Sequence, residues 1–422
     1  MVNVLDFKGN DDSQRIEQAI AHRDADGIVV IPPRSADAQS SRTHWLIDRT
    51  ILLPENTTIV LQNCRIKLSD RCRDNFFRSA NCGLGIEENE PLRNIHIRGE
   101  GYCVLEGADH PRAVGDGSKL LKNPCPYEKE DLLRLADWIP EERKSAGIVT
   151  FGDRHNRSFG TDAGRENESQ YGDWRGVGIL LAAVEHFSIE NISMIDTHGW
   201  AISLEACTHG RVQKIHFEMT MSKEIDGLRQ NMENQDGINL RNGCSHIIVS
   251  DITGRTGDDV VALTAIANPS RPYKPGGSLR TTHVMHNDWT RRDPHIHDII
   301  VRNVAAYSNI CLVVGIRPIA LARIWNVVVD GIIDTSPDPT TSRAVIQLGE
   351  PDHQYGVNEP DAMKSITISN VISNSQSAIL VKGILSDSVI ANVVQNTPDR
   401  PVMIVERENG LNNVQTSNFA SK

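Results

Sequence analysis

Short runs of alternating apolar and polar residues recur along the chain, and each run breaks at a turn-forming residue. Alternation with a period of two is typical of a half-buried β-strand, whereas Asn, Asp or Gly between apolar residues is typical of a turn. The pattern therefore predicts many short strands separated by similar corners. The clearest breaks are at Asn191, Asp251, Asn303, Asn370 and Asn392.

The spacing of these breaks favours a parallel β-solenoid. Asn370 and Asn392 lie 22 residues apart, and the longer gaps elsewhere accommodate insertions. One coil of a solenoid cannot bury its apolar face alone, but stacked coils share a continuous core. Because Asn tolerates a left-handed backbone and can stack on its neighbours, we expect the five breaks at equivalent corners of successive coils. A β-sandwich of hairpins is the alternative, but the Asn-Gly and Asp-Gly turns it requires are sparse.

The N-terminal residues differ from the repeats and predict a helix. Asp11 followed three residues later by Gln14 resembles a capping box, and Ile16, Ala19 and Ile20 follow at helical spacing. We expect this helix at about 12–23, where it would cap the open end of the solenoid.

Two stretches interrupt the repeat and are interpreted as loop insertions. Residues 106–175 are rich in Gly, Pro and charge and contain one plausible helix over 131–145, and residues 265–294 are rich in Pro, Gly, His and Arg. Long loops on a rigid scaffold often carry function, and these two would close one end of a cleft and favour exo action on a polymer. Residues 1–422 are thus expected to form a single all-β domain: a single-stranded parallel β-helix with a capping helix and two insertions.

Composition and charge narrow the function classes. A chain of 422 residues, 39% of them hydrophobic, can bury a large core. Its 44 Lys and Arg against 55 Asp and Glu give a formal net charge of −11, which argues against a nucleic-acid partner. No apolar run is long enough to span a membrane, and no signal peptide is evident, so we expect a cytoplasmic protein or a secreted or periplasmic one whose signal was removed. Monomer and homo-oligomer stay open.

The eight cysteines are scattered and include no CxxC pair. This pattern predicts buried free thiols in a reducing compartment, with neither a zinc site nor a disulfide framework. We accordingly expect no metal and no cofactor.

The sharpest local feature is a pair of acidic turns. Residues 234–237 (NQDG) and 257–259 (GDD) each precede an apolar strand. Aligning Ile238 with Val261 gives an offset of 23 residues, which is one coil. Stacked strands lie roughly 4.8 Å apart, so the two turns would bring their carboxylates within one sugar ring of each other.

The three carboxylates concerned are those of Asp236, Asp258 and Asp259. Asp236 and Asp259 each lie two residues before a core-facing apolar residue, so in a straight strand both side chains would point into the core. Burying two carboxylates there would cost much free energy. The glycines beside them predict a turn instead, and we expect all three carboxylates to converge on a solvent-filled cleft. A solvated acidic corner or a calcium site is the alternative.

The NQDG turn followed one coil later by GDD resembles the polygalacturonase (pectinase) family of glycoside hydrolases, of which this chain would be a divergent member. Residues 3–20, 98–107 and 199–215 also resemble early coils of such pectate-lyase-like proteins. The resemblance implies a right-handed parallel β-helix and inverting hydrolysis. It implies that Asp258 is the general acid and that Asp236 and Asp259 hold and activate a water. Close carboxylates raise one another's pKa, which favours one protonated acid.

The chain departs from that family in two motifs. Asn309 stands where the family's GHG motif has its histidine, and Gln347 and Gly349 stand where its RIK motif binds the substrate carboxylate. His283 and His286 on the second insertion are candidates to replace that histidine. Nearby basic residues are candidates to replace the RIK motif: Arg241, Lys274, Arg280, Arg317 and Arg343.

Three further residues complete the candidate substrate-binding set. Trp200 would stack on a sugar or pack in the core, since a cleft wall and a core both suit an aromatic ring. Glu205 falls at the position equivalent to Arg241 one coil away, so the two are expected to pair or to line the cleft. Asn234 belongs to the NQDG turn itself.

These features predict an inverting glycoside hydrolase acting on a plant or bacterial polysaccharide or oligosaccharide, with pectin-related substrates and exo action as narrower expectations. A polysaccharide lyase of the same fold is a second class, with the acids binding calcium and a Lys or Arg acting as base. A non-catalytic carbohydrate-binding β-helix is a third class, and an epimerase is a fourth.

Overall fold

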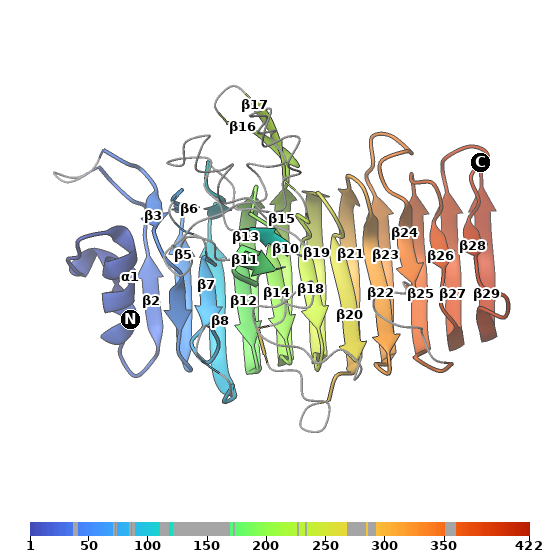
Figure 1. Ribbon diagram of the computed structural model, residues 1–422, viewed down its shortest axis with the longest axis horizontal. Helices are drawn as coiled ribbons and strands as arrows, with labels where there is room; N and C mark the ends of the chain where they lie inside the picture. The colour runs from blue at the N-terminus through green and yellow to red at the C-terminus, as the bar shows by residue number, and fades with distance from the viewer. Residues whose placement is uncertain are drawn as a thin grey trace, which may run out of the picture.

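The strands of the chain lie side by side along one long axis, with the N-terminal helix at one end and the C-terminus at the other (Figure 1). The computed structural model describes residues 1–36, 41–70, 72, 74–83, 86, 89–109, 118–120, 169–171, 174–225, 228–232, 234–267, 284–285, 293–350 and 360–422.

The larger of two parallel sheets has 15 strands, and twelve of them form a continuous ladder. In spatial order these are β1 (Val2–Asn3), β2 (Ile28–Ile31), β5 (Thr57–Gln62), β8 (Leu92–Glu100), β13 (Val184–Ile195), β15 (Thr208–Glu218), β19 (Ser245–Thr256), β21 (Ile296–Ser308), β23 (Ile324–Asp334), β25 (Met363–Ser373), β27 (Leu385–Gln395) and β29 (Leu411–Ser421). The other three are β3 (Trp45–Ile47), β6 (Arg65–Leu68) and β9 (Val104–Glu106), which pair in that order.

The smaller parallel sheet has 10 strands and alternates with the first along the chain. From the C-terminal end its strands are β28 (Met403–Val405), β26 (Ile379–Val381), β24 (Ala344–Leu348), β22 (Leu312–Ala320), β20 (Val261–Ala267), β18 (Ile238–Arg241), β14 (Ile202–Glu205), β12 (Ile179–Ala182), β7 (Phe77–Ser79) and β4 (Ile51–Leu53). Because consecutive strands alternate between two parallel sheets, each coil stacks on the next. The predicted fold class, a right-handed parallel β-helix, is confirmed.

One apolar core runs through the whole stack. Inward residues such as Ile238 of β18 and Ile247 of β19 come from opposite sheets and belong to one continuous cluster of buried side chains. Alternation of buried and exposed positions, as in β25, places the polar residues outside. The core therefore follows from the period-two pattern read in the sequence.

The five predicted corner residues occupy one column of left-handed corners. Asn191, Asp251, Asn303, Asn370 and Asn392 have φ angles between 54° and 58°. The strand register aligns them in one column, in which Lys214 and Gly331 occupy the two intervening levels. Their side chains are linked along the column: Asn303 Nδ2 donates to Asp251 Oδ1 (3.2 Å), and Asn392 Nδ2 donates to Asn370 Oδ1 (3.1 Å). The prediction of equivalent corners is confirmed, and hairpins of a β-sandwich are excluded for these strands.

The predicted helix covers the N-terminal end of the stack (Figure 1). Helix α1 (Asp12–Ala21) begins after the N-cap Asp11, whose Oδ1 accepts the Gln14 amide at 2.6 Å. Ile16 and Ala19 are fully buried in the common core. The helix ends two residues earlier than predicted, and it caps the solenoid as expected.

The remaining elements are short. They are the 3₁₀ turns η1 (Val4–Asp6) and η2 (Trp174–Gly176) and two antiparallel pairs, β10 (Ser118–Leu120) with β11 (Ser169–Tyr171) and β16 (Ser222–Ile225) with β17 (Leu228–Asn231). The helix predicted over 131–145 lies outside the described residues, so the extent of both insertions stays a prediction.

Within the described ranges no helix is long and apolar enough to cross a membrane. Seven cysteines in these ranges are buried and free, as predicted.

Candidate functional site

The two acidic turns lie at the start of neighbouring strands of the 10-stranded sheet. Strand β18 pairs with β20 in the register Ile238 with Val261, as predicted from the sequence. The Gly237 amide donates to the Asp259 carbonyl at 2.8 Å, which places Asp259 on Asp236 one coil away. Both residues precede the first strand residue, so the predicted turn at the strand's start is present.

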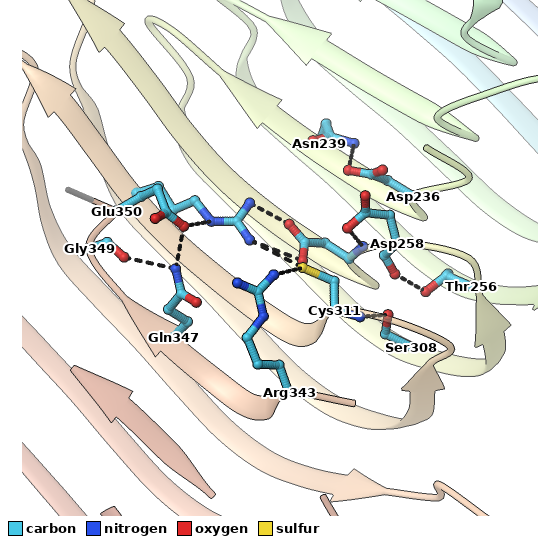
Figure 2. Close-up of polar contacts among 12 residues, drawn as sticks. Asp236, Asn239, Thr256, Asp258, Ser308, Cys311, Arg343, Gln347, Gly349 and Glu350 are labelled. Carbon is cyan, nitrogen blue, oxygen red and sulfur yellow. Dashed lines mark hydrogen bonds and ion pairs between the residues drawn. The ribbon is translucent and has the colours of Figure 1, made fainter. Parts of the chain in front are cut away.

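Asp236 is a buried carboxyl group with one hydrogen bond from a side chain. It is 6% exposed, and Asn239 Nδ2 donates to its Oδ2 at 3.1 Å (Figure 2). Burial raises the pKa of Asp236 well above its usual range, and the neighbouring carboxylates of Asp258 and Asp259 raise it further. This group is therefore built to keep a proton.

Asp259 is held as an ion pair with Arg317. It is 1% exposed, and Arg317 Nη1 and Nη2 donate to its two oxygens at 2.5 and 3.1 Å. Arg317 lies on β22, which pairs with β20 in the register Thr264 with Arg317. A bidentate guanidinium stabilises the ionised carboxylate, so the site contains one fixed charge pair.

Asp258 is the most accessible of the three carboxyls, being half-buried. Its Oδ1 accepts the Asp259 amide at 3.0 Å, and its carbonyl accepts the Thr256 hydroxyl at 2.6 Å (Figure 2). Burial and the Asp259 charge raise the pKa of Asp258, whereas Arg317 and a hydrogen bond with Cys311 oppose the rise. The most accessible of the three carboxyls is thus also one that retains a proton more readily than a free aspartate.

Cys311 and Arg343 complete the site on the next two coils. The register Val261 with Val314 continues backward to place Cys311 beside Asp258, and the Arg343 amide donates to the Cys311 carbonyl at 2.9 Å. Arg343 Nη2 contacts the Cys311 sulfur at 3.1 Å (Figure 2). Arg343 is exposed, and in the described part of the chain no ion pair with a carboxylate involves it.

A second polar group lies behind Arg317. Glu350 Oε2 is 3.9 Å from Arg317 Nε and accepts Gln347 Nε2 at 2.7 Å (Figure 2). Lys382 Nζ is 4.0 Å from Glu350 Oε1. The guanidinium of Arg317 is therefore shared between two acids, and Lys382 brings a further positive charge to the same edge.

Sequence reasoning missed Asn239, Cys311, Glu350 and Lys382. Asn239 stands on the strand directly after NQDG, so its proximity to Asp236 was readable from spacing alone. Cys311 was overlooked because the sequence comparison aligned Asn309 with a histidine, whereas one extra residue at the corner brings Cys311 to the level of Asp258. No local signal points to Glu350 or Lys382.

The site has donors for a cation, but their chemistry does not suit one. Donor atoms of Asp258, Asp259 and Cys311 lie within 4.8 Å of one another. Both oxygens of Asp259 are bound by Arg317, and burial together with the two carboxylates raises the pKa of the Cys311 thiol. A protonated thiol and a guanidinium-bound carboxylate are poor metal ligands.

The expectation that all three carboxylates face a solvent-filled cleft is wrong for two of them. Asp236 and Asp259 are buried, because each lies two residues before an inward-facing strand residue and points to the same side. Their burial is compensated by Asn239 and Arg317. Asp258 is half-buried, so the site offers one partly accessible acid backed by two enclosed ones.

The aromatic and charged residues predicted to line a cleft lie just before β14, on β14 and on β18. Trp200 is 9% exposed, and the guanidinium of Arg241 lies 4.7 Å from its ring centroid. Trp200 also belongs to a small buried apolar cluster, which favours the core role left open by the sequence. Glu205 stands at the level of Arg241, as predicted, and its carboxylate accepts the amides of Val284 and Met285 at 2.8 and 3.3 Å.

The remaining predicted residues are divided between the corner and the insertions. Asn234 is half-buried in a left-handed conformation with φ of 53°. Asn309 donates through Nδ2 to the Thr256 carbonyl at 2.7 Å and so closes the corner between two coils. Lys274, Arg280, His283 and His286 lie outside the described residues, and their substrate-binding roles stay predictions.

No family model and no curated protein matches this chain in sequence. Solved structures do match over its whole length. It is similar to a polygalacturonase from Erwinia carotovora ssp. carotovora, with a TM-score of 0.52 and 13% identity over 99% of this chain and 93% of that one. It is also similar to a hyperthermoactive exopolygalacturonase from Thermotoga maritima, with a TM-score of 0.52 and 14% identity over 100% and 91% of the two chains.

A tailspike protein of E. coli bacteriophage HK620, in complex with a pentasaccharide, is a third match. The TM-score is 0.53 and the identity 13%, over 100% of this chain and 66% of that one. At such identities the likeness concerns the fold. The β-helix that the family resemblance implied is therefore confirmed by independent structures.

Proposed function

We propose that this chain is a glycoside hydrolase whose general acid is Asp258. The observation that supports the proposal is the contrast among three adjacent carboxyls: Asp259 is ion-paired with Arg317, whereas burial and like charges raise the pKa of Asp236 and Asp258. Asp258 is the accessible member of the raised pair, so it can carry a proton to a glycosidic oxygen. An acid and a base held in different protonation states are what glycoside hydrolysis requires.

Asp236 and Asp259 are proposed to position the attacking water. An ionised carboxylate offers roughly four acceptor sites, and Arg317 occupies two of those on Asp259, so sites for a water remain. Asp259, which is ion-paired with Arg317, would accept the proton of the water, and Asp236 would hold that water through a hydrogen bond. This division of roles gives inversion at the sugar carbon, as the family resemblance implies.

The substrate is proposed to be an acidic polysaccharide or oligosaccharide of the pectin type. Arg343 is exposed beside Cys311 and Asp258, and it is the cation near the acid that no carboxylate of the described residues neutralises. A guanidinium recognises a carboxylate through paired hydrogen bonds, which suits a uronate sugar. Two of the structural neighbours are named as polygalacturonases, which supports the same substrate class.

A non-catalytic carbohydrate-binding role is the second candidate. Burial of Asp236 and Asp259 favours it, because a water must reach both for hydrolysis. A tailspike neighbour in complex with a pentasaccharide shows that this architecture also accommodates bound oligosaccharides.

The test is a panel of acidic and neutral polysaccharides incubated with the whole chain and with Asp258→Asn. New reducing ends without ultraviolet absorbance, lost in the variant, would support hydrolysis. An unsaturated, ultraviolet-absorbing product that disappears with a chelator would identify a lyase instead. Binding without either product, equal in both proteins, would establish the carbohydrate-binding role and refute catalysis.

A further inference from the structure

A column of histidines lies on the 15-stranded sheet, away from the acidic turns. His186 of β13, His209 of β15 and His246 of β19 occupy successive levels of a second left-handed corner, with φ angles of 60°, 55° and 56°. Their rings follow one another at centroid distances of 5.3 and 4.7 Å. Histidine tolerates the left-handed conformation, and three on successive levels place three imidazoles side by side on one face of the sheet.

This column borders a groove of about 580 Å³ on the outer face of the sheet. Besides the three column histidines, its lining includes His96, Arg211 and Arg302. The groove thus gives solvent and small ligands access to the imidazoles.

At the C-terminal end of the column, three potential ligand groups converge. The rings of His246 and His297 and the carboxylate of Asp298 each place one donor atom within 4.8 Å of the other two. Asp298 Oδ2 is 3.6 Å from His246 Nε2 and 2.7 Å from His297 Nδ1. Donor atoms bound to one metal at about 2.0–2.2 Å lie about 3.4 Å apart in a tetrahedral site, so the 3.6 Å pair fits already and the hydrogen-bonded 2.7 Å pair must open by less than about 1 Å.

A neighbouring side chain orients each of the three groups, and the one hydrogen bond between their donor atoms joins His297 Nδ1 to Asp298 Oδ2. Asn326 Nδ2 donates to Asp298 Oδ1 at 3.0 Å, so Oδ2 points away from that bond. The Trp325 ring stacks on His297 at 4.6 Å, and the His209 ring stacks on His246 at 4.7 Å, both within 11° of parallel. Outer contacts of this kind hold metal ligands in place.

We propose that His246, His297 and Asp298 form a binding site for a divalent transition metal of the zinc class. Two imidazoles and one carboxylate suit Zn²⁺ and its neighbours better than Mg²⁺ or Ca²⁺, which prefer oxygen ligands. The side chains of His246 and Asp298 are 49% and 37% exposed, so the remaining coordination positions open toward solvent and the groove. The metal would replace the proton shared by His297 and Asp298. The site is independent of the function proposed for the acidic turns.

The experiment titrates Zn²⁺ alone into the chelator-treated whole chain by calorimetry and repeats it with His246→Asn, His297→Gln and Asp298→Asn. Asn is a natural occupant of these left-handed corners, as at Asn326, so the first and third variants keep the backbone. The matched control is His186→Asn, which lies in the same column but outside the three ligands.

We expect one saturable equivalent of Zn²⁺ with low-micromolar or tighter affinity. Each ligand variant should weaken binding at least about tenfold, and Asn326→Gly should weaken it by a smaller factor. Cobalt substituted for zinc should give visible absorption that the ligand variants lose. The proposal is overturned if no saturable binding occurs, if the three variants bind as the parent does, or if His186→Asn loses as much affinity as they do.

Discussion

Asp259 and Arg317 are joined through both carboxylate oxygens and both terminal guanidinium nitrogens, although 58 residues separate them in the chain. The Asp259 carboxylate would be costly to keep in its buried position without this partner. Their pairing fixes a negative charge beside Asp236 and Asp258, and this fixed charge contributes to the raised pKa of both. The ion pair therefore links the stability of the coil stack to the protonation of the acidic turns.

The proposed roles of Asp258 and Asp236 can be separated by leaving-group dependence. Asp258→Asn is isosteric and removes only a transferable proton, so turnover of a polysaccharide should fall on the order of 10²–10⁴-fold. An aryl glycoside with a good leaving group needs less protonation and should lose less. Asp236→Asn should slow both substrates alike, because water activation is needed for either. Equal losses on both substrates for both variants would refute the assignment.

Removing Arg317 should destabilise the protein strongly. Arg317→Met leaves Asp259 buried without its partner, and we expect the free energy of unfolding to fall by roughly 3–5 kcal/mol. Asp259→Asn in the same chain removes the stranded charge and should recover part of the loss. A double-mutant cycle by denaturant unfolding measures the coupling, and additive effects of the two substitutions would contradict the pairing.

Asp236 should make stability fall as the pH rises. Its native pKa is raised above the usual 3.8, so the folded protein binds this proton more tightly than the unfolded chain. The stabilisation is present below that ordinary value and is lost as the pH passes through the higher native pKa. Asp236→Asn should therefore be more stable than the parent at neutral pH, by roughly 0.5–2 kcal/mol, and the two should converge in acid. Unfolding curves across this range test the sign, and a variant less stable at neutral pH would contradict it.

Substitutions in the corner column should lower the stability of the protein in two separable ways, through backbone strain and through lost hydrogen bonds. Asn392 is left-handed, donates to Asn370 and accepts from Asn418. Asn392→Ala should cost about 1–2 kcal/mol for the backbone alone, in addition to the lost hydrogen bonds. Asn392→Gly accepts the conformation and should cost less. Hydrogen exchange in β27 and β29 would measure both, and equal effects of Ala and Gly would show that strain plays no part.

Arg343 should govern the affinity for acidic sugars. If the proposed function holds, Arg343→Gln should raise KM for a uronate substrate by about tenfold, equivalent to ~1.4 kcal/mol, with little change in kcat. Arg302→Gln, on the opposite sheet, is the control for net charge. A KM that changes equally in both variants would assign the effect to overall charge instead of a specific contact.

The fold was predictable from the sequence because its determinants are local. Period-two alternation and a turn residue at Asn370 or Asn392 specify a coil within about twenty residues, and the register of Ile238 with Val261 required no more than adjacent coils. Cys311 and Arg343 were harder, since residues 265–294 separate their coils from the acidic turns. The histidine column was missed because His186, His209 and His246 are not usual turn residues, and their ligand partners His297 and Asp298 lie on the far side of the same insertion.

The left-handed corners have a consequence for how such a chain can change over generations. Each level requires only that one residue adopt a left-handed backbone conformation, and Asn, Asp, Gly and even Lys214 do so. The effect of a substitution on stability depends on its own coil and on the two coils that stack against it. Proteins with this fold can therefore exchange residues one at a time while the backbone is kept, so structural similarity persists after sequence similarity is lost.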